Sequence, residues 1–169
     1  MIKIGITGHR PNKLWGYDYR ETHYRNLKET FKSIIINIIQ EDIKSGGDGI
    51  LELISGMAIG TDTIYAVAAI ELRMEGYKIK FVAVIPFKGQ ESRWPKESQR
   101  IYQLLLSMAD EVVCVCDGGY APWKMQTRNK YIVDRCDRML SVWDGSPGGT
   151  KNCIDYAIKQ NKPITNIKP

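Results

Sequence analysis

Residues 50–85 read ILELISGMAIGTDTIYAVAAIELRMEGYKIKFVAVI, and this stretch decides the fold class. Residues 50–54 are a short apolar run, and residues 79–85 are a nearly continuous run of β-branched and aromatic side chains, as in buried strands. Residues 61–75 between them have the pattern of a helix that ends at Gly76. Strands that are apolar throughout and alternate with amphipathic helices indicate a parallel sheet covered on both faces.

The same alternation extends over the rest of the chain. The longest expected helix, residues 20–44, has apolar side chains at steps of three and four and stops at the glycines of residues 45–49. We expect the other strands at residues 2–7, 111–116, 138–143 and 163–167, and the other helices from Pro95 to Met108 and at residues 125–136 and 150–160.

These elements predict a single α/β domain over residues 1–169. Its sheet should be Rossmann-like, doubly wound and mainly parallel, with helices on both faces. We expect the strand order 3-2-1-4-5-6, numbered along the chain. In such a sheet the ligand lies at the carboxyl ends of the strands where the winding reverses, which here are the first and the fourth.

The amino-acid composition limits the kinds of ligand or partner that the chain is expected to bind. The 169 residues are 43% hydrophobic and 25% charged, which is ordinary for a globular protein and excludes disorder as the main state. There are 24 Lys and Arg against 19 Asp and Glu, so the formal net charge is +5. This mild excess favours anionic ligands but is too small to assign nucleic-acid binding.

Neither a membrane partner nor a metal is expected. The longest apolar run, residues 34–36, is far short of the ~20 residues that a membrane span needs. The chain opens directly on an expected strand with no signal peptide, which favours a cytoplasmic protein with reduced cysteines. The four cysteines and two histidines lack the spacing of a zinc site. No cofactor is expected beyond a nucleotide-like ligand, and the oligomeric state stays open, a homo-oligomer included.

The residues that can carry chemistry cluster directly after the expected strands. Because the carboxyl ends of parallel strands meet at one edge of a sheet, all five loops should lie together. The loops are residues 7–11 (TGHRP), 55–62 (SGMAIGTD), 86–90 (PFKGQ) with Trp94 beyond, 117–120 (DGGY) followed by Arg128 and Asn129, and 144–150 (DGSPGGT).

Two of these loops suit a phosphate group. Gly148, Gly149 and Thr150 open a helix, where free N–H groups and the positive end of the helix dipole favour an anion, and Thr150 can cap that helix. Gly56 to Gly60 opens another helix in the same way. The alternative is that both are only tight strand-to-helix turns. Neither G-x-G-x-x-G nor G-x-x-x-x-G-K-[ST] is present, which argues against an ordinary dehydrogenase or P-loop NTPase.

Two single residues each have two interpretations. His9 is a general base or phosphate ligand, or else a loop histidine satisfied by backbone hydrogen bonds. Asp62 complements the dipole of the helix that it opens, or else accepts a hydrogen bond from a ribose hydroxyl.

Five segments carry a family resemblance. They are Thr7-Gly8-His9-Arg10-Pro11, Ser55-Gly56-Met57-Ala58-x-Gly60-x-Asp62, Pro86-Phe87-x-x-Gln90-x-x-x-Trp94, Arg128-Asn129-x-x-Ile132-Val133-Asp134 and Pro147-Gly148-Gly149-Thr150-x-Asn152. In this order, and over nearly the whole chain, they resemble the YspA/YpsA-like family of the SLOG superfamily of Rossmann-like proteins. The second segment is also similar to the matching loop of DprA, a DNA-processing SLOG relative.

The resemblance implies a nucleotide-like ligand. The superfamily includes the LOG phosphoribohydrolases, which cleave the N-glycosidic bond of nucleotide monophosphates, and sensor domains proposed to bind NAD or ADP-ribose derivatives. The LOG loop Pro-Gly-Gly-x-Gly-Thr-x-x-Glu is matched only partly. Pro147, Gly148 and Gly149 fit, whereas Lys151-Asn152 replace the later Gly-Thr and Asp155 stands at the glutamate position.

The leading hypothesis is therefore binding of a phosphorylated nucleotide or nucleotide-derived small molecule, for sensing or sequestration. The alternative is an N-glycosidase or phosphoribohydrolase for nucleoside monophosphates or NAD-type substrates, with Asp62, Asp144 and Asp155 as candidate catalytic carboxylates. DprA-like nucleic-acid binding ranks third, because acidic residues are interspersed among the basic ones. The expected ligand-binding residues are Thr7, Gly8, His9, Arg10, Ser55, Gly56, Met57, Gly60, Asp62, Pro86, Gln90, Trp94, Arg128, Asn129, Gly148, Gly149 and Thr150.

Overall fold

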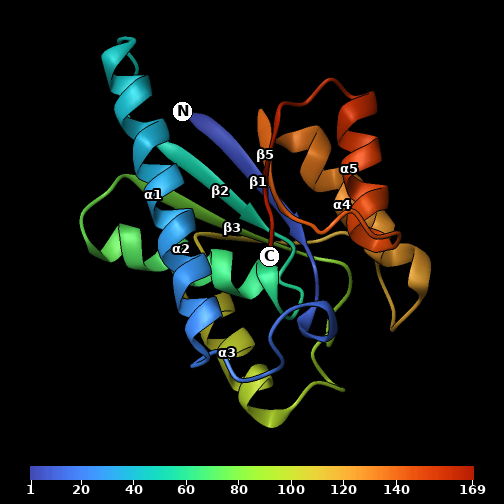
Figure 1. Ribbon diagram of the computed structural model, residues 1–169. Coiled ribbons are helices and arrows are strands. Elements are labelled where there is room, and N and C mark those ends of the chain that lie inside the picture. Colours follow the sequence, from blue (N-terminus) through green and yellow to red (C-terminus); the bar gives the residue numbers. More distant parts are fainter.

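The computed structural model describes residues 1–169 and contains one six-stranded sheet in which all paired strands are parallel (Figure 1). The strands are β1 (Ile2–Gly8), β2 (Leu51–Ser55), β3 (Ile79–Ile85), β4 (Glu111–Cys114), β5 (Arg138–Val142) and β6 (Ile164–Ile167). The helices are α1 (Thr22–Lys44), α2 (Thr61–Met74), α3 (Lys96–Ser107), α4 (Pro122–Arg135) and α5 (Gly149–Lys159), and a short 3₁₀ turn, η1 (Pro11–Lys13), follows β1.

The sheet confirms the doubly wound α/β fold but places one strand differently. Its order is β4-β3-β2-β1-β5-β6, whereas the sequence analysis expected 3-2-1-4-5-6 with the fourth strand beside the first. β4 instead pairs with β3 at the edge, and its partly buried residues suit that position. β5 takes the place beside β1, and its almost fully buried residues suit a central strand. The winding therefore reverses between β1 and β5.

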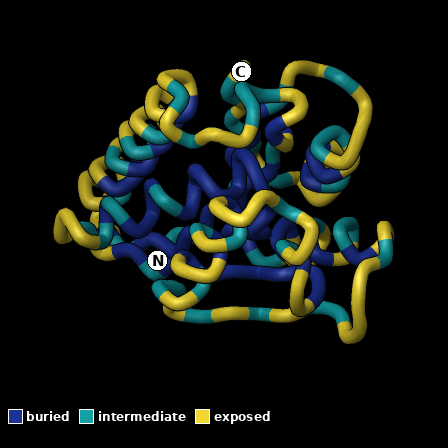
Figure 2. Tube along the Cα trace, turned by 90° about the horizontal axis from the view of Figure 1, so that it is seen from below, coloured by how far each residue is buried: buried dark blue, intermediate teal, exposed yellow.

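Helices cover both faces of the sheet. α1, α2 and α3 lie on one side, and α4 and α5 lie on the other (Figure 1). On the first side Phe31 of α1 and Tyr65 of α2 pack edge to face, with 5.4 Å between ring centroids, in one cluster with Ile4. On the other side Ile132 of α4 and Cys153 of α5 belong to a smaller cluster. Figure 2 shows the buried strands in the centre and the exposed residues on the outer turns.

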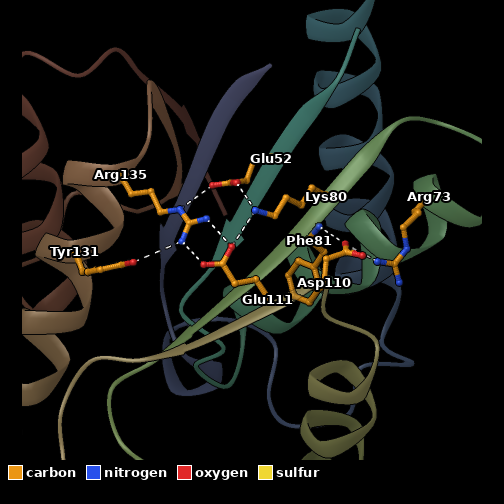
Figure 3. A network of polar contacts seen from close by, with 8 residues as sticks. All are labelled: Glu52, Arg73, Lys80, Phe81, Asp110, Glu111, Tyr131 and Arg135. Carbon is orange, nitrogen blue, oxygen red and sulfur yellow. Dashed lines mark hydrogen bonds and ion pairs between the residues drawn. The ribbon is translucent and has the colours of Figure 1, made fainter. Parts of the chain in front are cut away.

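An ion-pair network fixes the end of α4 to the sheet (Figure 3). Glu52 of β2 is almost fully buried and accepts hydrogen bonds from Arg135 Nε at 2.7 Å and Lys80 Nζ at 3.1 Å. Glu111 of β4 accepts from both terminal nitrogens of Arg135 and from Lys80 Nζ, each at 2.9 Å. Burial opposes the ionisation of Glu52, but Arg135 and Lys80 together lower its pKa. Arg128 lies about two helical turns before Arg135, on the same side of α4.

Two helices begin earlier than the sequence analysis expected. α4 begins at Pro122, because proline at a first helical position costs no intrahelical hydrogen bond. α5 begins at Gly149 and no side chain caps it, so Thr150 lies inside the first turn and does not act as the cap. None of the helices combines the length and the apolar character needed to cross a membrane.

Candidate ligand-binding site

A polar cavity of about 190 Å³ opens at the carboxyl end of β1, where the winding of the sheet reverses. Residues from the end of β1 and the loop after it, from the loop before α2 and its first turn, from α4 and from the first turn of α5 line it. They are Thr7, Gly8, His9, Arg10, Asn12, Lys13, Ala58, Asp62, Met125, Gln126, Arg128, Asn129, Gly149 and Thr150. Only 2 of these 14 residues are hydrophobic, so the cavity suits a polar or charged ligand.

Side-chain contacts join the loops after β1 and β5. His9 is buried, and its Nε2 lies 2.8 Å from Asp144 Oδ1. Lys13 Nζ donates to Ser146 Oγ at 2.9 Å and to the carbonyl of Pro147 at 3.0 Å. Hydrogen bonds from Ser146 and from His9 hold the pKa of Asp144 well below its ordinary range. The loops on either side of the point where the winding reverses are thus held together by the contact of His9 with Asp144 and by the hydrogen bonds of Lys13.

Arg128 brings a buried positive charge to the polar cavity. Its side chain is only 4% exposed, and its Nη1 donates to the carbonyl of Gly56 while its Nε donates to Asn129 Oδ1 at 2.8 Å. The other terminal nitrogen, Nη2, makes no hydrogen bond within the protein. Burial lowers the pKa of Arg128, but a guanidinium stays protonated at neutral pH. A buried arginine with a free donor at a cavity wall is suited to bind an anion.

Asp62 is the buried carboxylate of the polar cavity. One oxygen, Oδ2, accepts from the N–H of Ala58 at 3.2 Å, and the other makes no hydrogen bond within the protein. Burial raises the pKa of Asp62, and the nearby charges of Arg128 and Arg10 oppose that rise. The carboxyl group therefore has one oxygen available for a ligand hydroxyl.

The first turn of α5 forms another wall. Gly148 precedes it with a φ of 142°, a conformation that favours glycine, and Gly149 and Thr150 line the cavity. Because no side chain caps α5, the N–H groups of this turn are free, and the helix dipole adds partial positive charge. A Cβ added at Gly149 would find its nearest neighbour, Gln126 Nε2, at 3.8 Å, so there is open space in front of this turn.

The loop after β2 supports the polar cavity from behind. Ser55 Oγ donates to the carbonyl of Asp62 at 2.9 Å and accepts from the N–H of Met57 at 3.1 Å. Gly60 has a φ of 98°, and a Cβ there would lie 2.8 Å from the carbonyl oxygen of His9. Glycine at this position therefore lets the loops after β1 and β2 approach each other closely.

Comparison with known proteins identifies the family. The model of the YspA SLOG family matches residues 4–168, which include every segment that lines the polar cavity. The chain belongs to the YspA SLOG family. This membership confirms the resemblance seen in the five loop segments.

Two curated relatives match most of the length of this family member. The uncharacterized SPbeta prophage-derived protein YoqJ of Bacillus subtilis is 31% identical over 144 residues, which cover 79% of this chain and 81% of YoqJ. A UPF0398 protein of Bacillus cereus is 24% identical over 164 residues, which cover 96% of this chain and 85% of that protein.

Two solved structures share the fold. DNA processing protein A (DprA) from Streptococcus pneumoniae superposes with a TM-score of 0.65 at 20% identity, over 98% of this chain and 50% of DprA. DprA from Helicobacter pylori, described for its single-stranded DNA binding mode, superposes with a TM-score of 0.63 at 15% identity, over 98% of this chain and 64% of that chain. The chain thus spans about half to two-thirds of the length of these DprA proteins.

The family member brings most of its expected ligand-binding residues to one place. Those that line the polar cavity are Thr7, Gly8, His9, Arg10, Asp62, Arg128, Asn129, Gly149 and Thr150. Those that do not line it are Ser55, Gly56, Met57, Gly60, Pro86, Gln90, Trp94 and Gly148. Of the candidate catalytic carboxylates, Asp62 lines the cavity, Asp144 is engaged by His9, and Asp155 lies on the outside of α5, 2.5 Å from Lys151 Nζ.

Some lining residues were missed by the sequence analysis. They are Asn12, Lys13, Ala58, Met125 and Gln126. Lys13 lies two positions after Pro11, the last residue of the first loop segment, so a basic residue close to this segment was the available signal. Met125 and Gln126 carry no such signal, because only the packing of α4 brings them to the edge of the sheet.

A second cavity, of about 600 Å³, adjoins the polar one and shares Arg10 and Met125 with it. We call it the aromatic cavity, because Phe87, Trp94 and Tyr120 line it. The remaining lining residues are Lys88, Gly89, Gln90, Ser92, Arg93 and Gly119. The expected ligand-binding residues Gln90 and Trp94 therefore lie here.

Proposed function

We propose that the chain binds a phosphorylated nucleotide or a nucleotide-derived small molecule at the carboxyl edge of its sheet. The observation that carries this proposal is the buried guanidinium of Arg128, which leaves Nη2 free in a cavity that is also lined by the uncapped first turn of α5. A buried charge and free helix N–H groups beside the same small volume are the ordinary protein environment of a phosphate.

Each part of the ligand then has a partner. The phosphate accepts hydrogen bonds from Gly149 and Thr150 N–H and from the guanidinium groups of Arg128 and Arg10, while Lys13 adds positive charge at the rim. Asp62, with its free oxygen, accepts a hydrogen bond from a ribose hydroxyl. Family membership supports this choice of ligand class.

Isothermal titration calorimetry with three probes tests the proposal. AMP and ribose 5-phosphate should both bind, and adenosine, which lacks the phosphate, should bind far more weakly. Arg10→Ala should weaken AMP binding by about 10- to 150-fold, since a lost charged hydrogen bond costs roughly 1.5–3 kcal/mol, while the exposed Arg20→Ala should not. Equal binding of adenosine and AMP would contradict the proposal. A fluorescent oligo(dT) is the fourth probe. Tight binding of this DNA, without binding of AMP or ribose 5-phosphate, would favour a DprA-like role.

A second candidate function is hydrolysis of the N-glycosidic bond of the bound nucleotide. Asp62 favours it, because its carboxylate beside the ribose site can stabilise positive charge at C1′, and burial, which raises its pKa, makes it a stronger base for the activation of water. Chromatography for released base, with wild-type protein and Asp62→Asn, distinguishes the two functions. Hydrolysis predicts turnover that collapses in Asp62→Asn with near-normal affinity, whereas binding alone predicts no released base and a modest loss of affinity.

A further inference from the structure

The aromatic cavity has the size and the walls for a planar ring. Its volume is about 600 Å³, within the usual range of small-molecule sites. Phe87 is buried at its wall, whereas Tyr120 is 67% exposed, and their ring centroids lie 6.2 Å apart in an edge-to-face arrangement. Trp94 packs edge to face on Tyr102 at 5.3 Å. Tyr120 therefore keeps ring surface free for stacking.

The amide of Gln90 gives this cavity a hydrogen-bonding preference. Gln90 is buried, and its Nε2 donates to the carbonyls of Gly56 and Met57 at 3.4 and 3.3 Å and faces the hydroxyl of Tyr102 at 3.4 Å. Two of these three partners are carbonyl oxygens, which only accept, so the nitrogen faces them. The other atom, Oε1, is consequently left as a buried acceptor without a donor. An acceptor in this state is costly. Oε1 is closed to solvent in the free protein, so a ligand N–H relieves that cost once a shift of the Gln90 side chain brings Oε1 to the cavity that Gln90 lines.

The two cavities are arranged for one ligand. Arg10 and Met125 line both, and the carbonyl of Gly56 accepts from Arg128 on the polar side and from Gln90 on the aromatic side. A molecule with a phosphate at one end and a flat ring at the other can therefore span them past Arg10.

Resting on the nucleotide binding proposed above, we infer that the aromatic cavity holds a nucleobase with an exocyclic amino group, which stacks on Tyr120 and donates to Gln90 Oε1. This assignment names the ligand class more closely as an amino-bearing nucleotide. Uracil, thymine and hypoxanthine nucleotides lack the amino group, so this assignment predicts that they bind less tightly.

Matched nucleotide pairs test the inference in calorimetric titrations of the wild-type protein. Each pair differs by the amino group alone: AMP and purine riboside 5′-monophosphate, GMP and IMP, CMP and the 5′-monophosphate of 2-pyrimidinone riboside. At least one amino-bearing member should bind about 5- to 150-fold more tightly than its partner and than ribose 5-phosphate. Equal affinities within all three pairs would overturn the base assignment. If ribose 5-phosphate still bound, the phosphate site would stand, whereas failure of every phosphorylated probe would overturn the proposed function itself.

Two variants connect the preference to the named residues. In Gln90→Met, the two nucleotides of the pair with the largest affinity ratio in the wild type should bind about equally. Both affinities are measured on the same variant, so their ratio does not depend on a change in stability. Tyr120→Ala should weaken binding of the best nucleotide about 5-fold or more, and weaken ribose 5-phosphate less. Trp123→Ala is the matched control, because Trp123 is 60% exposed, lies nearby on α4 and lines neither cavity. An unchanged pair ratio in Gln90→Met, or equal losses in the Tyr120 and Trp123 variants, would contradict the assignment.

Discussion

His9 Nε2 lies 2.8 Å from Asp144 Oδ1, so the loop after the first strand is joined to the loop after the fifth. β1 and β5 are neighbours in the sheet, but their chains leave toward opposite faces, and the winding opens a crevice between them. The contact holds the two sides of that crevice together. It also fixes the position of His9 at the wall of the polar cavity.

Asp144→Asn should lower the melting temperature at pH 7. Hydrogen bonds from Ser146 and His9 lower the pKa of Asp144 in the folded protein, so its stabilising contribution is present above the ordinary value of 3.8 and is lost as the pH falls below it. The difference from wild type should therefore shrink between pH 5 and pH 3. Thermal melts over this range provide the measurement, with Asp155→Asn on the surface of α5 as the control. Equal melting temperatures of the wild type and Asp144→Asn at pH 7 would contradict the role given to this contact.

Gly149→Asp should abolish phosphate binding in a folded protein. The new carboxylate would occupy the open space in front of the first turn of α5 and repel an anion. The same charge complements the helix dipole, so the melting temperature should not fall. Gly149→Ala, whose Cβ has room, separates charge from bulk and should bind AMP more tightly than Gly149→Asp. An aspartate variant that binds AMP as tightly as the wild type would remove α5 from the site.

Gly56→Val should reduce both stability and ligand affinity. A Cβ at this position would lie 2.6–2.8 Å from the guanidinium atoms of Arg128, which is itself buried and has little space to move. We expect the free energy of unfolding to fall by about 1–3 kcal/mol, as in other overpacked interiors. Gly119→Ala is the control, since nothing lies within 4 Å of its Cβ position. Denaturant titrations would refute the close packing of Gly56 and Arg128 if the valine variant unfolded like the wild type.

The fold could be predicted because its signals are local. β2 and β3 are buried along nearly their whole length, so their sequences are apolar without alternation, and this implies a sheet covered on both faces. The position of β4 could not be read in the same way. Its sequence, Glu-Val-Val-Cys, is as apolar as that of a central strand, although its Glu111 pairs with Lys80 and Arg135 at the edge.

Much of the candidate site followed from one rule, that the carboxyl ends of parallel strands meet at one edge. That rule was enough to bring His9, Arg10 and Asp62 together with Gly149. The rule could not reveal that Arg128 is buried, because this burial depends on how α4 packs. The ion pairs of Arg135 with Glu52 and Glu111 fix that helix, and these residues are far apart in sequence. Nor could it reveal the unpaired oxygen of Gln90, which depends on the carbonyl directions of Gly56 and Met57.

Glu111→Gln should make the free energy of unfolding less dependent on pH in the acid range. Arg135 and Lys80 lower the pKa of Glu111 to about 2, so its contribution is complete above the ordinary value of 4.5 and is lost as the pH falls from there toward 2. The wild type should therefore lose stability across this window more steeply than the variant, in denaturant titrations at several pH values. Glu29→Gln, on the exposed surface of α1, is the control. Parallel curves for the wild type and Glu111→Gln would mean that the network does not stabilise the fold.

The location of the phosphate is tested most directly by the amide chemical shifts of the wild-type protein during titration with AMP. Anion binding between Arg128 and the first turn of α5 predicts that the largest changes fall on the backbone N–H signals of Gly149 and Thr150 and on the Nη2–H signal of Arg128. Changes that leave these three signals in place while others move, or no change at saturating AMP, would contradict the account.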